Sequence, residues 1–165
     1  MNEILVPNAR LYAGRQELEL TAERLGSGKD GIVLVAKRKA QPANVALKVL
    51  RWREFYQREK QVYERLLELG IATVLGFNVP QLLGYDDELR VIEMTIVKRP
   101  FVLDFAGAYL DARPKFPCDV WAEWETDKRE QFEDRWPRVR GVLDAFEELG
   151  IYLLDVSPGN IAFLD

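Results

Sequence analysis

Short apolar runs in the first half of the chain have the alternation or the β-branched composition of β-strands. Residues 18–25 approximate alternation, residues 32–36 are a β-branched run, and residues 44–50 form a third run that contains one lysine. Residues 79–85 and 89–97 are two further runs, and the acidic residues between them are typical of a hairpin turn. This pattern predicts five strands.

Two longer segments show the 3.6-residue period of amphipathic helices. Residues 51–69 place apolar side chains on or near one face and stop at Gly70, and residues 127–149 carry a second apolar stripe. Pro137 lies inside the second segment, where it either kinks the helix or begins a new one. We also expect a short helix at residues 102–110.

The order of these elements predicts an α+β fold. A five-stranded antiparallel sheet with one helix would be followed by a mostly helical second part. Residues 112–126 would form a loop with at most a short helix, and residues 151–165 would form a loop flanked by short strands.

Composition narrows the class of protein. The chain has 165 residues, 48% of them hydrophobic and 30% charged, which fits one domain or two small lobes with a sizeable core. A net charge of −4 without a basic block argues against a nucleic-acid partner. The single cysteine excludes a disulfide framework and a cysteine-ligated zinc cluster.

The chain contains no histidine, which excludes several kinds of active site. Acid–base chemistry must fall to carboxylates, lysines or tyrosines, and a metal would be a hard, oxygen-ligated ion such as Mg²⁺. No apolar run approaches the roughly 20 residues of a membrane span, and the N-terminus lacks the pattern of a signal peptide. We therefore expect a cytoplasmic protein without a membrane partner.

Four groups of residues could carry chemistry, and the first is the string G-S-G-K-D-G-I-V at residues 26–33. Glycines there let the backbone approach a phosphate and direct amide N–H groups at it. The string lacks the following helix of a dinucleotide-binding fingerprint and the Gly-Lys-Ser/Thr of a Walker loop. Taken alone, it is more simply a glycine-rich turn.

The second and third groups are single ionisable residues on neighbouring elements. Lys48 lies within an apolar strand, where it needs an anionic partner unless the strand exposes it to solvent. Glu59 has Val62, Tyr63 and Leu66 at i+3, i+4 and i+7, so it faces the core side of its helix. A carboxylate in that position needs a cation, and Lys48 is the candidate.

The fourth group is the loop D-V-S-P-G-N at residues 155–160, between two apolar segments. The carboxylate of Asp155 could accept a hydroxyl proton, and the carbonyl oxygen of Asn160 could ligate Mg²⁺. Taken alone, this sequence is more simply a turn that Asp155 caps.

Together and in this order, the four groups resemble the motifs of the protein-kinase-like superfamily over residues 18–165. The first group is similar to the glycine-rich loop. The sequence V-A-L-K, which ends at Lys48, is similar to the strand-three lysine motif, and Glu59 is similar to the glutamate of the αC helix. Residues 89–94 resemble strand five. The Asp-x-Ser-x-x-Asn loop at 152–160 is closer to atypical, RIO-like or small bacterial kinases than to typical protein kinases.

The resemblance implies a protein-kinase-like fold, with an N-terminal lobe at residues 1–97 and a truncated helical lobe at residues 98–165. It also implies binding of ATP and Mg²⁺ and phosphoryl transfer to a hydroxyl of a protein or small molecule. Lys48, Glu59 and Asp155 would be catalytic, and Asn160 would hold the metal. Ile92 would be the gatekeeper, and Glu93, Met94 and Thr95 the adenine hinge. The remaining residues expected at the nucleotide are Gly26, Ser27, Gly28, Gly31, Val33 and Ala46.

The end of the chain departs from the family pattern. Leu153 and Leu154 stand where the catalytic loop usually has His and Arg. Asp165 lies five residues past Asn160, about 16 Å of extended chain, so we do not expect it to be the family's second metal-binding aspartate. That aspartate and the activation segment would then be missing. Three interpretations stay open: an active kinase, a pseudokinase that binds nucleotides or proteins, and a fragment whose missing part supplies the activity.

A truncated lobe would also expose apolar surface. The stripe formed by Val139, Val142, Leu143 and Phe146, together with Ile161 and Phe163, would lack its usual cover. Exposed patches of this kind mark interfaces, so we expect self-association, unless the tryptophan-rich segment before residue 127 folds over the stripe.

Overall fold

The structure is a computed structural model that describes residues 4–164. As predicted, the fold is α+β with a five-stranded antiparallel sheet, in the strand order β1-β2-β3-β7-β6. Neighbouring strands are consecutive in sequence except β3 and β7, which places the longest connection in the middle of the sheet. The strands are β1 (Leu18–Ser27), β2 (Gly31–Arg38), β3 (Asn44–Leu50), β6 (Leu82–Asp86) and β7 (Val91–Thr95).

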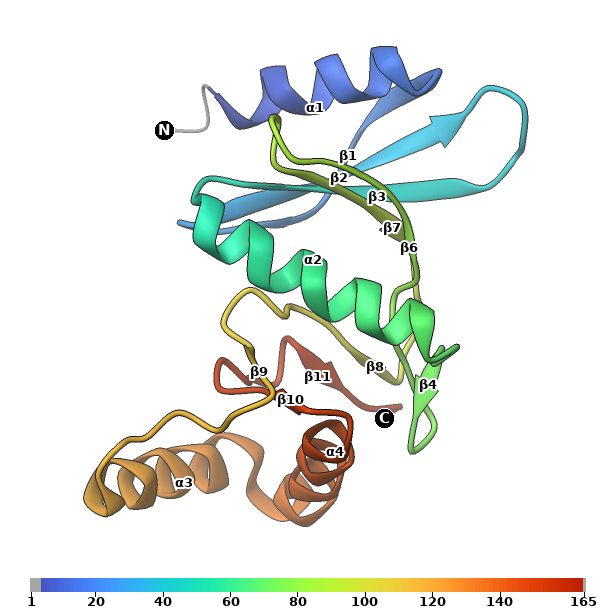
Figure 1. Cartoon of the computed structure of the whole chain (residues 1–165). Helices are drawn as coiled ribbons and strands as arrows, with labels where there is room; N and C mark the ends of the chain where they lie inside the picture. The colour runs from blue at the N-terminus through green and yellow to red at the C-terminus, as the bar shows by residue number, and fades with distance from the viewer. Residues whose placement is uncertain (1–3, 165) are drawn as a thin grey trace.

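Helices cover both faces of this sheet (Figure 1). The helix predicted after the third strand is α2 (Arg53–Glu68), and it lies on one face. The opposite face carries α1 (Leu5–Arg15), which the sequence analysis did not predict. The buried side of α1 includes Ala9 and Ala13, which are too small to make a strong apolar stripe. The sheet therefore separates two cores, one under α1 and one between α2 and the rest of the chain.

Short strands replace the helix expected at 102–110. The chain forms β8 (Phe101–Val102) and β9 (Tyr109–Leu110), so that expectation is wrong. Asp104 between them has a φ of +67°, which an α-helix cannot contain. Strand β8 pairs with β5 (Phe77–Asn78) and with β11 (Ile161–Ala162), whereas β9 pairs with β10 (Ile151–Tyr152). A further strand, β4 (Thr73–Val74), pairs with β5.

The helical region after residue 117 begins earlier than predicted. Helix α3 (Cys118–Phe132) occupies much of the expected loop, and a 3-10 turn (Glu133–Arg135) separates it from α4 (Trp136–Glu148). Glu133 has a φ of +52°, which ends α3, and Pro137 lies in the first turn of α4. Pro137 therefore begins a new helix and does not kink a longer one, because proline fits the first turn of a helix without loss of a hydrogen bond.

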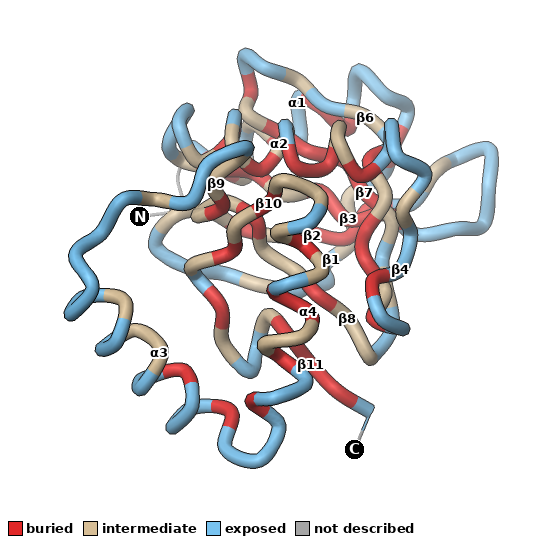
Figure 2. Tube along the Cα trace, turned by 60° about the horizontal axis from the view of Figure 1, so that its bottom comes forward, coloured by how far each residue is buried: buried red, intermediate tan, exposed pale blue. Residues whose placement is uncertain are grey.

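The apolar stripe of α4 is covered within the chain, contrary to expectation. Its residues and those of β11 are buried (red in Figure 2), and Phe163 lies edge-on to Phe77 with ring centroids 5.2 Å apart. The reason for expecting self-association is therefore removed. The covered residues are Val139, Val142, Leu143, Phe146, Ile161 and Phe163. Within residues 4–164, no helix combines the length and the apolar character that a membrane span requires.

A buried polar cluster joins α1 to the sheet. Glu93 of β7 is 2% exposed, and its carboxylate accepts a hydrogen bond of 2.8 Å from the hydroxyl of Tyr12 and another from Arg38. Gly84 on the neighbouring strand lies directly beneath the Tyr12 hydroxyl, since a Cβ at this position would be 2.6 Å from that oxygen. The absence of a side chain at Gly84 thus allows α1 to approach the sheet.

We expect Gly84→Ala to lower the free energy of unfolding by about 1–3 kcal/mol, because the added methyl group must displace Tyr12 from Glu93. Urea unfolding followed by circular dichroism measures this change. Gly14→Ala is the matched control, since nothing lies within 4 Å of a Cβ at Gly14 and alanine favours the helix there. Equal stability of Gly84→Ala and the wild type would contradict the described packing.

Stability should also fall steeply at alkaline pH because of three buried phenols. Burial raises the pKa of Tyr12, Tyr56 and Tyr63 above the usual value of about 10, and acidic neighbours, Glu93, Asp87 and Glu59 respectively, raise it further. Above that pH the unfolded chain releases protons that the native protein keeps. The free energy of unfolding should therefore fall by up to about 4 kcal/mol per pH unit.

Urea unfolding between pH 9 and pH 11, with tyrosinate absorbance recorded in parallel, measures this slope. Tyr12→Phe should make this slope less steep, because one proton fewer is released on unfolding. Ionisation of all six tyrosines near pH 10 in the folded protein would show that the three phenols are not buried as described.

Candidate functional site

A cavity of about 440 Å³ lies between the glycine-rich hairpin and the segments that follow the sheet. This volume is within the range of about 300–1,000 Å³ that is typical of ligand sites. Several parts of the chain form its walls: residues 25–31, β2, β3, α2, Pro80, residues 94–97, residues 103–107 and the loop at 155–160. Residues far apart in the sequence therefore converge on one space.

Hydrogen bonds hold the turn of the glycine-rich hairpin at residues 28–31. The amide of Gly28 donates to the carbonyl of Gly31 at 3.0 Å, and Arg51 donates from its backbone to Asp30 and from its side chain to Lys29. Gly31 itself serves packing, because a Cβ there would be 2.5 Å from the carbonyl oxygen of Val49. Gly28 has open space around it, which leaves the tip free to approach a ligand.

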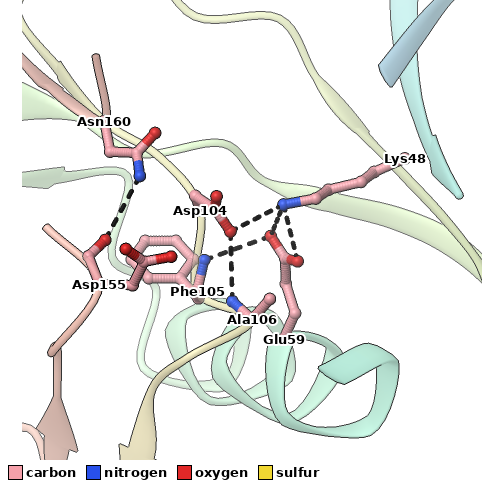
Figure 3. Close-up of polar contacts among 7 residues, drawn as sticks. All are labelled: Lys48, Glu59, Asp104, Phe105, Ala106, Asp155 and Asn160. Atoms are coloured by element: carbon pink, nitrogen blue, oxygen red, sulfur yellow. Dashed lines mark hydrogen bonds and ion pairs between the residues drawn. The ribbon is translucent and has the colours of Figure 1, made fainter. Parts of the chain in front are cut away.

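Lys48 and Glu59 form the predicted ion pair at the back of the cavity (Figure 3). The lysine Nζ lies 2.8 Å from both carboxylate oxygens, and Glu59 is fully buried in α2. A third charge joins them, since Oδ1 of Asp104 accepts a hydrogen bond of 3.0 Å from the same Nζ. The lysine thus bridges two carboxylates from different elements.

Burial and charge act in opposite directions on this cluster. Burial alone lowers the pKa of Lys48, but the carboxylates of Glu59 and Asp104 outweigh it, so the pKa is raised and the ammonium stays charged. Burial raises the pKa of Glu59, and Lys48 opposes that effect. A positive charge is therefore fixed at the cavity wall at neutral pH.

Asp104 is positioned by its own backbone conformation and by the two residues that follow it. Its left-handed conformation turns the chain after β8, so that the amide of Phe105 donates to Glu59 at 3.3 Å and that of Ala106 donates to Asp104 at 3.4 Å. The Phe105 ring is fully buried and lies edge-on to Tyr63, with ring centroids 5.2 Å apart. The buried ring of Phe105 thus anchors the turn that contains Asp104, whose side chain is one-third exposed.

The loop at 155–160 reaches the cavity from the other side. Asn160 Nδ2 donates to the carbonyl of Asp155 at 3.3 Å, and the amide of Leu103 donates to the carbonyl of Asn160 at 2.8 Å. A Cβ at Gly107 would be 3.2 Å from the Cβ of Asp155, so the missing side chain lets the two segments touch. Figure 3 shows Asp104 between the Lys48–Glu59 pair and the two loop residues.

Most of the side chains predicted for the site line this cavity. Lys48, Glu59, Asp155 and Asn160 are all present in its wall. The predicted nucleotide-binding residues that line it are Gly26, Ser27, Gly28, Gly31, Val33, Ala46, Met94 and Thr95.

Two predicted residues of β7 are not part of the cavity wall. Ile92 is buried in the core, and Glu93 points to the opposite face of the sheet, where it binds Tyr12 and Arg38. Because side chains alternate along a strand, Met94 rather than Glu93 faces the cavity, beside Ala46 of β3, whereas Ile92 shares that face but is enclosed in the core. The wall then continues along residues 95–97.

The sequence analysis missed Asp104. Residues 102–110 had been assigned to a helix, which hid an aspartate that follows an apolar strand and precedes a phenylalanine and a glycine. The antiparallel pairing of β8 with β11 brings this aspartate beside the loop at 155–160. Asp165, which the analysis had considered and rejected as a second metal ligand, lies outside the described residues.

The charges of the site fit an anion that is accompanied by a cation. Lys48 and Glu59 compensate one another, which leaves the carboxylates of Asp104 and Asp155 in the wall. These would repel a polyphosphate alone but attract a divalent cation. No group of three or more acidic or cysteine ligands gathers among residues 4–164, which is compatible with Mg²⁺, an ion usually held by one or two carboxylates, substrate oxygens and water.

Comparison of the sequence with models of known protein families and with curated proteins finds no match. The function is therefore inferred from the chemistry of the cavity. The groups available are backbone amides of a glycine-rich hairpin, a fixed lysine, the carboxylates of Asp104 and Asp155 and the amide oxygen of Asn160.

Proposed function

We propose that this protein is a protein-kinase-like phosphotransferase that binds Mg-ATP in the cavity and transfers a phosphoryl group to a hydroxyl acceptor. The observation that carries the proposal is the position of Lys48. Its ammonium is fixed by Glu59 in a cavity that also contains the glycine-rich hairpin, Asp155 and Asn160. Phosphoryl transfer depends mainly on positioning and on neutralisation of charge, which these groups supply.

Asp104 supports an active enzyme rather than a degenerate one. The second metal-binding aspartate of the family lies on a strand that pairs with the one after the catalytic loop. In this chain the partner of β11 is β8, and Asp104 follows β8. The group that the sequence analysis expected to be missing is thus supplied by a segment that precedes the loop in the sequence.

Each residue has a defined role in this proposal. The amides at 26–31 hold the phosphates, Lys48 neutralises their oxygens, and the oxygens of Asp104 and Asn160 hold Mg²⁺. When bound, ATP would supply the phosphoryl group, and Mg²⁺ would supply additional positive charge beside the phosphate oxygens. Asp155 orients the acceptor hydroxyl and takes its proton as the oxygen bonds to the γ-phosphorus and the bond to the β–γ bridging oxygen breaks.

We expect Lys48→Ala to weaken Mg-ATP binding at least about tenfold, because an ionic contact to the phosphates is lost. Asp155→Asn should keep the affinity within about twofold and reduce turnover by about 10²–10⁴-fold, because only the acceptor loses its base. Titration calorimetry measures binding, and transfer of labelled phosphate to protein and small-molecule acceptors measures turnover.

Lys37→Ala is the matched control, since Lys37 is exposed on β2, away from the cavity wall. Circular dichroism checks that each variant is folded. Wild-type binding without any turnover would identify a nucleotide-binding module instead, and unchanged binding by Lys48→Ala would contradict the site itself.

The role of Asp104 is tested through the dependence on magnesium. In the wild type, ATP without Mg²⁺ should bind poorly because Asp104 and Asp155 repel it. Asp104→Asn removes one of these charges and one metal ligand, so the gain in affinity on addition of Mg²⁺ should shrink several-fold. Calorimetric titrations with Mg²⁺ and with a chelator measure this gain. An identical gain in Asp104→Asn and the wild type would show that Asp104 does not hold the metal.

A further inference from the structure

The loop that carries Asp155 has a support from outside the cavity. The carbonyl of Leu154, the residue before Asp155, accepts a hydrogen bond of 3.0 Å from Nε1 of Trp124 in α3. Trp124 is not part of the cavity wall. A contact so close to Asp155, made by a residue that does not reach the ligand space, can act only through the loop.

Helix α3 contributes little to the core, which makes this contact unusual. Only Lys128 and Phe132 are buried within the helix, and Figure 2 shows α3 along the edge of the molecule with most of its trace exposed. Aromatic rings attach it to α4, with the centroid of Trp136 6.2 Å from Trp124 and 6.3 Å from Phe132. The helix nevertheless directs one polar group, the indole N–H of Trp124, at the loop.

The loop holds itself by few hydrogen bonds: the side chain of Asn160 donates to the carbonyl of Asp155 at 3.3 Å, and the backbone is bonded at the far end of the loop. There the amides of Asn160 and Ile161 both donate to the carbonyl of Ser157 at 2.9 Å. At the near end Leu153 and Leu154 are apolar, so their side chains offer no hydrogen bond. At this end the indole of Trp124 adds a hydrogen bond that comes from outside the loop.

We propose that Trp124 is a positioning residue that holds the loop so that the carboxylate of Asp155 faces the acceptor hydroxyl. The expected effect on turnover rests on the proposed function, whereas the expected effect on the loop does not. Loss of the indole N–H should loosen the backbone at Leu154 and let Asp155 sample other orientations. Nucleotide binding should be spared, because the hairpin, Lys48 and Asp104 are untouched and the carbonyl of Asn160 still accepts the hydrogen bond from the amide of Leu103.

Trp124→Phe tests this directly, since it keeps an aromatic ring in α3 and removes only the donor. Trp121→Phe is the matched control: its ring lies 5.9 Å from Trp124 on the same helix and packs under Arg113 at 4.0 Å. In Trp124→Phe we expect kcat to fall about 3- to 10-fold, the effect of one hydrogen bond, with Mg-ATP affinity unchanged within twofold. Trp121→Phe should change neither quantity.

Amide hydrogen exchange read by NMR gives a second measurement that needs no activity. The amides of Asn160 and Ile161 should exchange several-fold faster in Trp124→Phe than in Trp121→Phe. In the wild type, the indole N–H of Trp124 should exchange more slowly than that of Trp52, which is 55% exposed. This wild-type comparison remains informative if Trp124→Phe does not fold.

The outcomes separate the two proposals. Faster exchange with a lower kcat and unchanged affinity supports the positioning role. Unchanged exchange in Trp124→Phe, a fast-exchanging indole N–H in the wild type, or an equal loss of kcat in Trp121→Phe overturns it. A wild-type protein without turnover refutes the proposed function and the catalytic part of this role together, whereas exchange still decides whether Trp124 holds the loop.

Discussion

The buried ion pair between Lys48 and Glu59 is the interaction on which the rest of the site depends. It joins β3 to α2 through a fully buried Glu59, and Asp104 and the amide of Phe105 attach the segment after β8 to it. Removal of one partner would leave an uncompensated buried charge, a loss of about 3–5 kcal/mol in comparable cases. The pair thus fixes the spacing of sheet, helix and acidic turn at once.

Much of this arrangement could be predicted from the sequence, because its signals are local. The period of the strands and of α2, the helical neighbours of Glu59 and the lysine within an apolar run together predicted the ion pair. Asp104 could not be found in this way. Its position depends on the pairing of Val102 with Ile161 and on one left-handed residue, and neither leaves a periodic signal in the sequence.

Neighbouring residues of β7 act on opposite faces of the sheet. Glu93 holds α1 through Tyr12 and Arg38, while Met94, its neighbour, reaches the cavity from the other face. The sequence analysis placed both residues in the adenine hinge, but alternate side chains point to opposite faces, so only Met94 lines the cavity. Two helices outside the site supply similar support, with α1 behind the sheet and Trp124 of α3 behind the loop of Asp155.

The central claim is that the cavity holds a nucleotide with its metal ion between Asp104 and Asn160. A crystal structure of the protein with Mg²⁺ and a non-hydrolysable ATP analogue tests it most directly. The account predicts phosphates under residues 26–31 and next to Lys48, with Mg²⁺ coordinated by oxygens of Asp104 and Asn160. An empty cavity at saturating analogue, or a metal ion bound away from both residues, would contradict it.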